Sequence, residues 1–136
     1  MNRLFENGSA EVCLRENVGL LAYSPLAFGV LSGKFLSGKS QPNARITLFP
    51  QFSIYNSAQC AEATRLYQEI AQKNGLSLTE LSLAFVSQQP FVTSTIIGAT
   101  NLIQLEENIN SIQITLSEDI LKEIEKVQSS IPDPAP

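Results

Sequence analysis

A glycine turn followed by polar residues at helical spacing is the first candidate site in this sequence. Gly98-Ala99-Thr100-Asn101 follows the β-branched run Val92–Ile97 and precedes Gln104, Glu107 and Asn108. If a strand passes through this turn into a helix, the free N–H groups of the first helical turn form a site for an anion. The three polar residues lie at i, i+3 and i+4 and share one helix face, where a glutamate and an asparagine can pair with a purine. Ordinary helix capping with a polar, solvated face explains the same residues and stays open.

The second candidate is the segment from Tyr23 to Lys34, where an apolar run ends. Ligands of α/β folds bind beyond the carboxyl ends of parallel strands. Gly29 and Gly33 let the backbone approach a ligand closely, and Lys34 offers a positive charge to a phosphate. A plain connection from a strand to a helix, with a solvated lysine, is the alternative.

Composition excludes several kinds of site. The 136 residues include no histidine, which excludes a Ser-His-Asp or Cys-His hydrolase and any histidine-ligated zinc or haem on this chain alone. Cys13 and Cys60 form no C-x-x-C pair, so we predict that both are reduced and buried, and that there is no metal site. The net charge of −4 gives no support for a nucleic-acid partner. Without a signal peptide, a disulfide framework or an apolar run that could cross a bilayer, we expect a cytoplasmic location and no membrane partner.

Helices that alternate with strands are predicted to position these residues. We expect helices over Glu6–Glu16, from Ser57 to Asn74-Gly75, from Ser77 to Gln89, over about Leu102–Asn110, and from Ser117 to about Ser129. Val18–Tyr23 and Val92–Ile97 are predicted to be strands, the first of them buried. This order is typical of parallel βαβ units. Because two strands cannot cover so many amphipathic helices, the pattern indicates part of a larger α/β fold.

Local signals refine two of these elements. Ser77-Leu78-Thr79-Glu80 is a capping box for the helix that follows it. The helix from Ser57 carries one broad apolar stripe, made of Ala61, Thr64, Leu66, Tyr67, Ile70 and Ala71. Ser24–Ser40 and its continuation to Asn56 form a loop that is long for a compact domain. Because this loop carries several leucines and phenylalanines, we expect it to be packed or to cover a ligand.

Taken together, the two candidate segments resemble the cofactor half of an aldo-keto reductase. The resemblance is carried by Ser24-Pro25-Leu26-Ala27-x-Gly29-x-Leu31-x-Gly33-Lys34, by Gly98-Ala99-Thr100-Asn101-x-x-Gln104-Leu105-x-Glu107-Asn108-Ile109, and by Ala44-Arg45-x-Thr47-Leu48-Phe49 and the tail Pro134-Ala135-Pro136. Members of this family are TIM barrels that reduce carbonyls with NADPH, and such barrels need roughly 250 residues. The resemblance therefore implies that residues 1–136 are the C-terminal part of one barrel domain, incomplete on its own. Val18–Tyr23 would be its seventh strand and Thr93–Ile97 its eighth.

The resemblance also implies a set of cofactor contacts. Tyr23 would stack on the nicotinamide ring, and Ser24, Pro25, Leu26, Ala27, Phe28 and Lys34 would hold the pyrophosphate and its ribose. Arg45 and Thr100 would approach the adenosine 2′-phosphate, Gly98 would give the close turn, and Gln104, Glu107 and Asn108 would hold the adenine end. There is no lysine or arginine between Lys73 and Lys122, so the loop after the eighth strand has no cation. We expect NADP as the cofactor, with NAD as the alternative.

The catalytic residues of the family have no counterpart in this chain. By resemblance, the family's Asp, Tyr, Lys and His tetrad belongs to the early strands, and the absence of histidine agrees with this for one member. We therefore expect an NADP-binding portion that is inactive alone, with no catalytic residue of its own. The alternative is a non-catalytic protein that binds a nucleotide or associates with itself. The expected partners are a nicotinamide dinucleotide and either a homo-oligomer or the missing N-terminal half.

Overall fold

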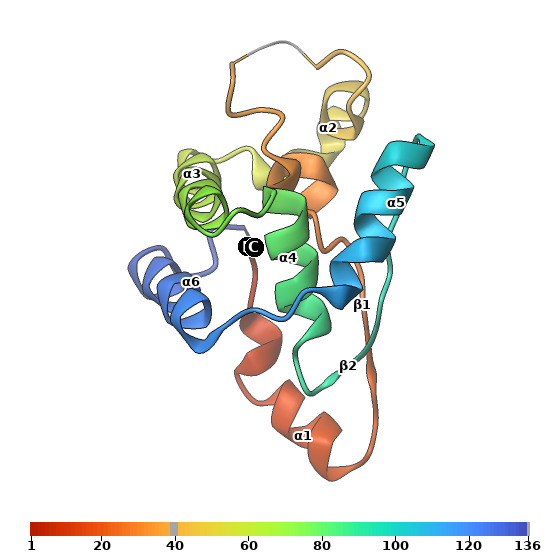
Figure 1. The fold of residues 1–136 in the computed structure, drawn as a ribbon, viewed down its shortest axis with the longest axis vertical. Helices are drawn as coiled ribbons and strands as arrows, with labels where there is room; N and C mark the ends of the chain where they lie inside the picture. The colour runs from red at the N-terminus through yellow and green to blue at the C-terminus, as the bar shows by residue number, and fades with distance from the viewer. Residues whose placement is uncertain (39–40, 136) are drawn as a thin grey trace.

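A two-stranded parallel sheet lies on one side of helix α4 (Leu78–Ser87) in the computed structural model, which describes residues 1–38 and 41–135 (Figure 1). Its strands are β1 (Leu20–Ala22) and β2 (Val92–Thr95), so the predicted parallel pair is confirmed with shorter bounds. Close pairing requires a glycine before β1, because a Cβ on Gly19 would lie 1.7 Å from Thr93 Oγ1.

The N-terminal helix begins later than the sequence predicted. Leu4–Glu6 forms a short 3₁₀ helix (η1), and α1 covers Ser9–Arg15 rather than Glu6–Glu16. Gly8 separates the two with φ +119°, a backbone conformation that L side chains rarely adopt. The helix therefore starts after the glycine instead of running through it.

The long segment after β1 contains more regular structure than the predicted loop. It forms a 3₁₀ stretch over Ala27–Ser32 (η2), a short helix α2 over Arg45–Leu48 and a second 3₁₀ stretch over Pro50–Tyr55 (η3). Ser40, where the small-residue part of the loop was expected to end, lies outside the described residues, as does Pro136 of the tail. The prediction of a packed segment is confirmed, because Ala27, Val30 and Leu31 belong to the hydrophobic core.

The hydrophobic core lies between α4 and the two helices α3 (Ala58–Lys73) and α6 (Glu118–Ser130), opposite the sheet (Figure 1). Each of these three helices starts at a predicted serine cap, whose hydroxyl oxygen accepts a backbone N–H of the first turn: Ser57, Ser77 and Ser117. The capping box of α4 is complete, and α3 ends at Asn74 as predicted. Two members of the predicted stripe of α3 differ: Ala61 is exposed and Leu66 is half-buried, while Cys60 and Ala63 are buried in their place.

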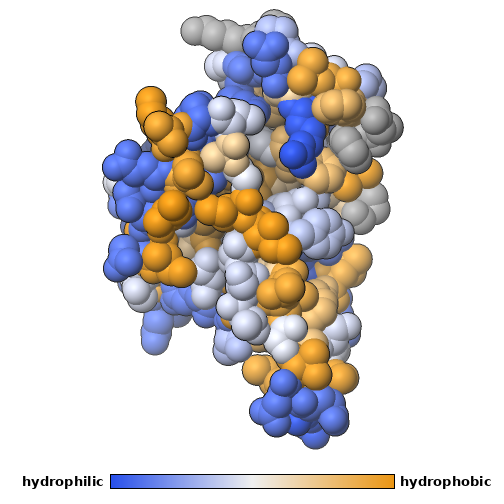
Figure 2. All heavy atoms as spheres, turned by 90° about the vertical axis from the view of Figure 1, so that its right-hand side faces the viewer, coloured by the Kyte–Doolittle hydropathy of each residue, from blue (hydrophilic) through white to orange (hydrophobic). Residues whose placement is uncertain are grey.

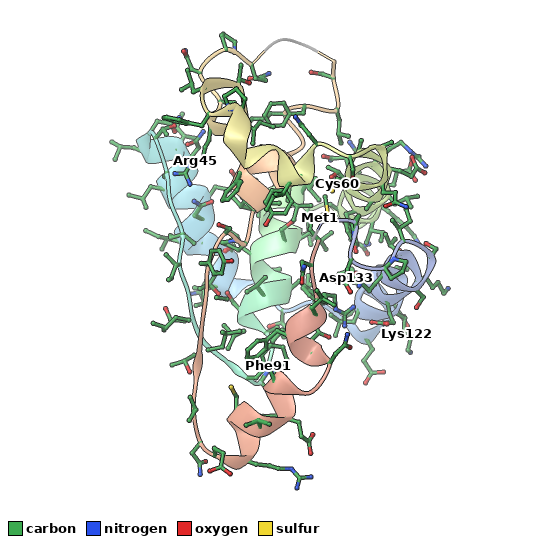
Figure 3. The ribbon with its side chains drawn as sticks, turned by 180° about the vertical axis from the view of Figure 1, so that it is seen from behind. Met1, Arg45, Cys60, Phe91, Lys122 and Asp133 are labelled. Atoms are coloured by element: carbon green, nitrogen blue, oxygen red, sulfur yellow. The ribbon has the colours of Figure 1, made fainter. Side chains whose placement is uncertain are left out.

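Hydrogen bonds and an ion pair join the two ends of the chain beside this core. Asn2 Nδ2 donates to the carbonyl oxygen of Ala135 at 2.9 Å, and Arg3 N donates to Asp133 Oδ1 at 2.6 Å. The Arg3 guanidinium also pairs with Glu125 of α6 at 2.8 Å. Figure 3 shows Met1 and Asp133 close together beside α6. These contacts make residues 1–3 and 133–135 part of one folded unit.

Only one of the two cysteines is fully buried. Both are free thiols, as expected. Cys60 is completely buried, and its thiol donates to the carbonyl oxygen of Pro134 at 3.1 Å. Cys13 is only partly buried, so that part of the prediction is wrong, because α1 is short and its neighbouring residues Val12 and Leu14 are exposed.

The predicted burial of β1 is also wrong. One side of the sheet packs on α4, where Ser87 Oγ and Thr95 Oγ1 are hydrogen-bonded at 3.1 Å. On the other side Leu21, which is paired with Ser94, is 60% exposed and Tyr23 is 79% exposed. The apolar run could line a buried layer, but no described residue covers this side of the sheet.

A continuous apolar surface results, which we call the open face. Helix α5 (Leu102–Asn110), found with the predicted bounds, leads into a 3₁₀ turn over Ser111–Gln113 (η4) and adds an exposed apolar stripe to the exposed side chains of the sheet. The open face consists of Leu21, Tyr23, Ile96, Leu102, Leu105, Ile109 and Ile112. Figure 2 shows a band of hydrophobic side chains on the side of the molecule where α5 and the strands lie.

Among residues 1–38 and 41–135, no helix is long and apolar enough to cross a membrane. Within the same part of the chain, no three His, Cys, Asp or Glu side chains are grouped closely enough to hold a metal ion.

Candidate nucleotide-binding site

The segment that follows β1 has an unusual backbone. Ser24, Ala27 and Phe28 have φ values of +54°, +49° and +54°, in the left-handed region that residues other than glycine rarely occupy. The bend is held by backbone hydrogen bonds, among them Gly29 N to the carbonyl oxygen of Leu26 at 2.8 Å. Non-glycine residues in this region cost on the order of 1–3 kcal/mol each and cluster where a site must be pre-shaped. The observation therefore favours a functional reading of Tyr23–Phe28 over that of a plain connection.

Lys34 lies against the backbone of this bend. A Cβ on Gly29, whose φ is +93°, would lie 2.8 Å from Lys34 Nζ, so the glycine leaves room for the ammonium group. The ammonium also sits over the Phe35 ring, 5.3 Å from its centre. Partial burial lowers the pKa of Lys34. A partly desolvated cation held beside a bent backbone is suited to a phosphate, because its charge is screened less than at the open surface.

Arg45, from the start of α2, reaches the same bend. Its guanidinium lies over the Phe28 ring, 5.9 Å from the ring centre. Tyr55, at the end of η3, packs against Phe28 in a T-shaped arrangement, with the two ring centres 5.2 Å apart. Burial raises the pKa of Tyr55. The structure thus brings together the predicted candidates Phe28 and Arg45 and adds Tyr55, which no sequence motif singled out although it ends the same aromatic-rich segment.

The glycine turn after β2 is braced by the helix that follows it. Asn101 caps α5, since its Oδ1 accepts the Gln104 N–H at 2.9 Å. Gln104 Oε1 accepts both the backbone N–H of Thr100, at 3.0 Å, and the Thr100 hydroxyl, at 2.9 Å. Asn108 is buried, and its Nδ2 donates to the carbonyl oxygen of Gly98 at 3.2 Å. The predicted strand, turn and helix are confirmed, and two of the three polar residues shape the turn itself.

Glu107 is directed to another element. Its Oε1 accepts a hydrogen bond from the hydroxyl of Ser77, the N-cap of α4, at 2.6 Å. Because α5 is helical over Leu102–Asn110, the expectation that Gln104, Glu107 and Asn108 share one helix face is confirmed. All three bond to protein groups, and their contact with an adenine stays a prediction.

Both groups of residues lie at the same end of the molecule. They follow the carboxyl ends of two strands that are parallel, and Figures 1 and 3 show α2, with Arg45, and the start of α5 at this end. The combination provides two cations, an exposed tyrosine ring, a strained backbone bend and a capped helix N-terminus. These groups match the chemistry of a ligand with phosphates and flat rings.

Comparison with known proteins defines the class. The model of the Aldo/keto reductase family matches residues 1–129, and the chain therefore belongs to this family. The protein Tas of Escherichia coli is 49% identical over 136 residues, covering all of this chain and 39% of Tas. The L-glyceraldehyde 3-phosphate reductase of Escherichia coli is 31% identical over 133 residues, covering 94% of this chain and 38% of that enzyme. A probable voltage-gated potassium channel subunit beta of Arabidopsis thaliana is 32% identical over 120 residues, covering 85% of this chain and 37% of that protein.

The likeness extends to three dimensions. The glycerol dehydrogenase of Gluconobacter oxydans matches with a TM-score of 0.76 at 22% identity, covering 99% of this chain and 41% of that structure. The chain has the fold of the C-terminal part of a TIM barrel, with β1 and β2 as the seventh and eighth strands. It spans about two fifths of the length of the relatives that it matches.

Proposed function

We propose that residues 1–136 are the C-terminal part of one aldo/keto reductase barrel domain and supply its NADP-binding portion. The observation that carries the proposal is the strained bend after β1, with Lys34 and Arg45 beside it. Tyr23 is 79% exposed and offers a flat face for stacking with the nicotinamide ring. NADPH would supply the hydride for carbonyl reduction.

The two cations have different proposed partners. Lys34 lies beside the bend and is the candidate for the pyrophosphate. Arg45 extends from α2 towards the end of the molecule where α5 begins, and it is the candidate for the adenosine 2′-phosphate (Figure 3). Thr100 adds a hydroxyl and a backbone N–H from the glycine turn. Because the sequence has no lysine or arginine between Lys73 and Lys122, the preference for NADP over NAD rests on Arg45.

Nucleotide titration of a linked barrel tests this proposal. In one polypeptide, the part of E. coli Tas that this chain does not match is joined to residues 1–136, and NADPH and NADH binding are followed by the fluorescence of the nicotinamide. Arg45→Met should weaken NADPH binding about tenfold and leave NADH binding nearly unchanged, while Lys34→Met should weaken both. Lys126→Met, on α6, is the matched control. Equal binding of NADPH by all variants would refute the proposal.

The chain alone is expected to be inactive. The family tetrad is assigned by resemblance to residues outside this chain, and the sequence has no histidine. Incubation of the purified 136-residue chain with NADPH and a panel of aldehydes should give no nicotinamide oxidation. Turnover above the rate without protein would contradict this part of the proposal.

A second candidate function is a non-catalytic protein that associates with itself. The open face favours it, because contiguous exposed apolar surface is rare on monomeric soluble proteins. Light scattering of the purified chain, together with NADPH titration, distinguishes the two functions: a stable homo-oligomer that binds no nucleotide favours the second.

A further inference from the structure

The open face has a composition that is unfavourable in water. Leu102 is 82% exposed and Leu21 60% exposed, although leucine is among the residues most often buried. Along α5 and into η4 the stripe follows the spacing i, i+3, i+7 and i+10, through Leu102, Leu105, Ile109 and Ile112, which is the pattern of a helix that packs against a neighbour. The opposite side of α5 is already used, since Asn108 and Ser111 are buried there.

The backbone of the sheet also has groups without a partner strand among the described residues. In the part of the chain that the structure describes, β1 and β2 pair only with each other, so each strand has an outer edge without a partner strand. Free edges of parallel strands are sites for the addition of further strands. The open face wraps around the edge of β2, from the sheet residues Leu21, Tyr23 and Ile96 to the stripe of α5.

The rest of the chain forms a unit that does not use this face. The core between α3, α4 and α6 lies on the opposite side of α4 (Figure 1). Hydrogen bonds join the two ends of the chain there, from Asn2 to Ala135 and from Arg3 to Asp133. A folded unit with one apolar side is the form expected of a subunit that docks on a partner.

We infer that the open face is the docking surface for a polypeptide that carries the other βα units of an aldo/keto reductase barrel, and that non-covalent docking is sufficient to complete the nucleotide site. This inference rests on the proposed function. The relatives supply the argument for the occupant, because each is matched over most of this chain but only over about two fifths of its own length. Six further strands would pair with both free edges and cover the sheet residues of the open face, as in a closed eight-stranded barrel.

The test uses the 136-residue chain and, as a separate polypeptide, the part of E. coli Tas that it does not match. The two are co-expressed, purified through a tag on the chain, and analysed by light scattering and NADPH titration. We expect a 1:1 complex that binds NADPH. The double variant Leu102→Asp/Ile109→Asp should weaken the complex about tenfold or more, since it buries carboxylates in an apolar contact. Ala61→Asp on α3, which is exposed outside the open face, should leave the complex unchanged.

The linked polypeptide of the previous section separates the possible failures. If the linked protein binds NADPH while the separate parts do not associate, the docking inference is overturned and the proposed function stands. If a 1:1 complex forms and is sensitive to the double variant but binds no nucleotide, docking stands and the proposed function fails. Association that tolerates the double variant, self-association in place of the 1:1 complex, or a linked protein that does not fold also overturns the inference.

Discussion

Removal of the Ser77 hydroxyl should destabilise the chain by more than the loss of a helix cap. Ser77 Oγ accepts the Glu80 N–H at 3.0 Å and donates to Glu107 Oε1 at 2.6 Å. The lost cap costs about 1 kcal/mol. A hydrogen bond adds about 0.5–1.5 kcal/mol, and because Glu107 is only half-buried, water can replace part of it. We expect Ser77→Ala to lower the free energy of unfolding by about 2 kcal/mol in total.

Urea unfolding followed by circular dichroism measures this change. Ser117→Ala is the matched control, because Ser117 caps α6 through the Ile120 N–H at 3.4 Å, and it should cost about 1 kcal/mol or less. A double-mutant cycle with Glu107→Ala isolates the bond between the two side chains, and we expect a coupling energy of about 0.5–1 kcal/mol. Equal losses for Ser77→Ala and Ser117→Ala, together with a coupling energy near zero, would refute the structural role of Glu107.

Three further predictions test the packing. Gly19→Ala should strongly destabilise the sheet, because its Cβ would lie 1.7 Å from Thr93 Oγ1, and Thr93→Gly should partly restore the free energy of unfolding. Burial raises the pKa of Tyr67 to about 12, above its ordinary value of about 10. Its contribution to stability is therefore complete below about pH 10 and is lost as the pH rises towards 12; urea unfolding from pH 9 to 12 should show a smaller loss for Tyr67→Phe. Leu81→Ala, at 2% exposure, should cost about 2–5 kcal/mol in urea unfolding, whereas Leu102→Ala should change stability by about 0.5 kcal/mol or less.

Helix boundaries could be predicted because their signals are local. A serine directly before a stretch of apolar residues at helical spacing is visible in the sequence, and Ser57, Ser77 and Ser117 all begin helices where expected. The bounds Leu102–Asn110 of α5 follow in the same way from the turn Gly98-Ala99-Thr100-Asn101 and the helical spacing behind it. In each case the residues that form the element also carry the signal.

Burial could not be predicted in the same way, because it depends on what lies against an element. Val18–Tyr23 has the composition of a buried strand, yet Leu21 is exposed. The sequence also does not predict the left-handed backbone at Ala27 and Phe28, because neither residue type favours it and the surrounding packing must impose it. The short helices Arg45–Leu48 and Pro50–Tyr55 could not be predicted either, because a helix of four to six residues is too short to show an apolar period.

In the candidate site, the helical spacing could be predicted from the sequence but the hydrogen-bond partners could not. Spacing was sufficient to place Gln104, Glu107 and Asn108 on one face of α5, but it gave no sign of their partners, because Ser77 is thirty positions from Glu107 in the sequence. The partners change how the residues can act. Asn108 and Gln104 hold the glycine turn, so under the proposed function they would act on a nucleotide by fixing the position of Thr100.

The bond to Ser77 fixes the orientation of the Glu107 side chain. Its Oε1 accepts the Ser77 hydroxyl, which is also the cap of α4, and its second oxygen, Oε2, keeps acceptor capacity. Under the proposed function, Glu107 would contact an adenine through Oε2 in this fixed orientation, whereas the charged groups of Lys34 and Arg45 would contact phosphates. Nucleotide affinity should therefore come mainly from the bend after β1 and its two cations. On this argument α5 serves the site by holding the glycine turn and by joining it to α4, and its exposed apolar stripe remains available for the docking of further βα units.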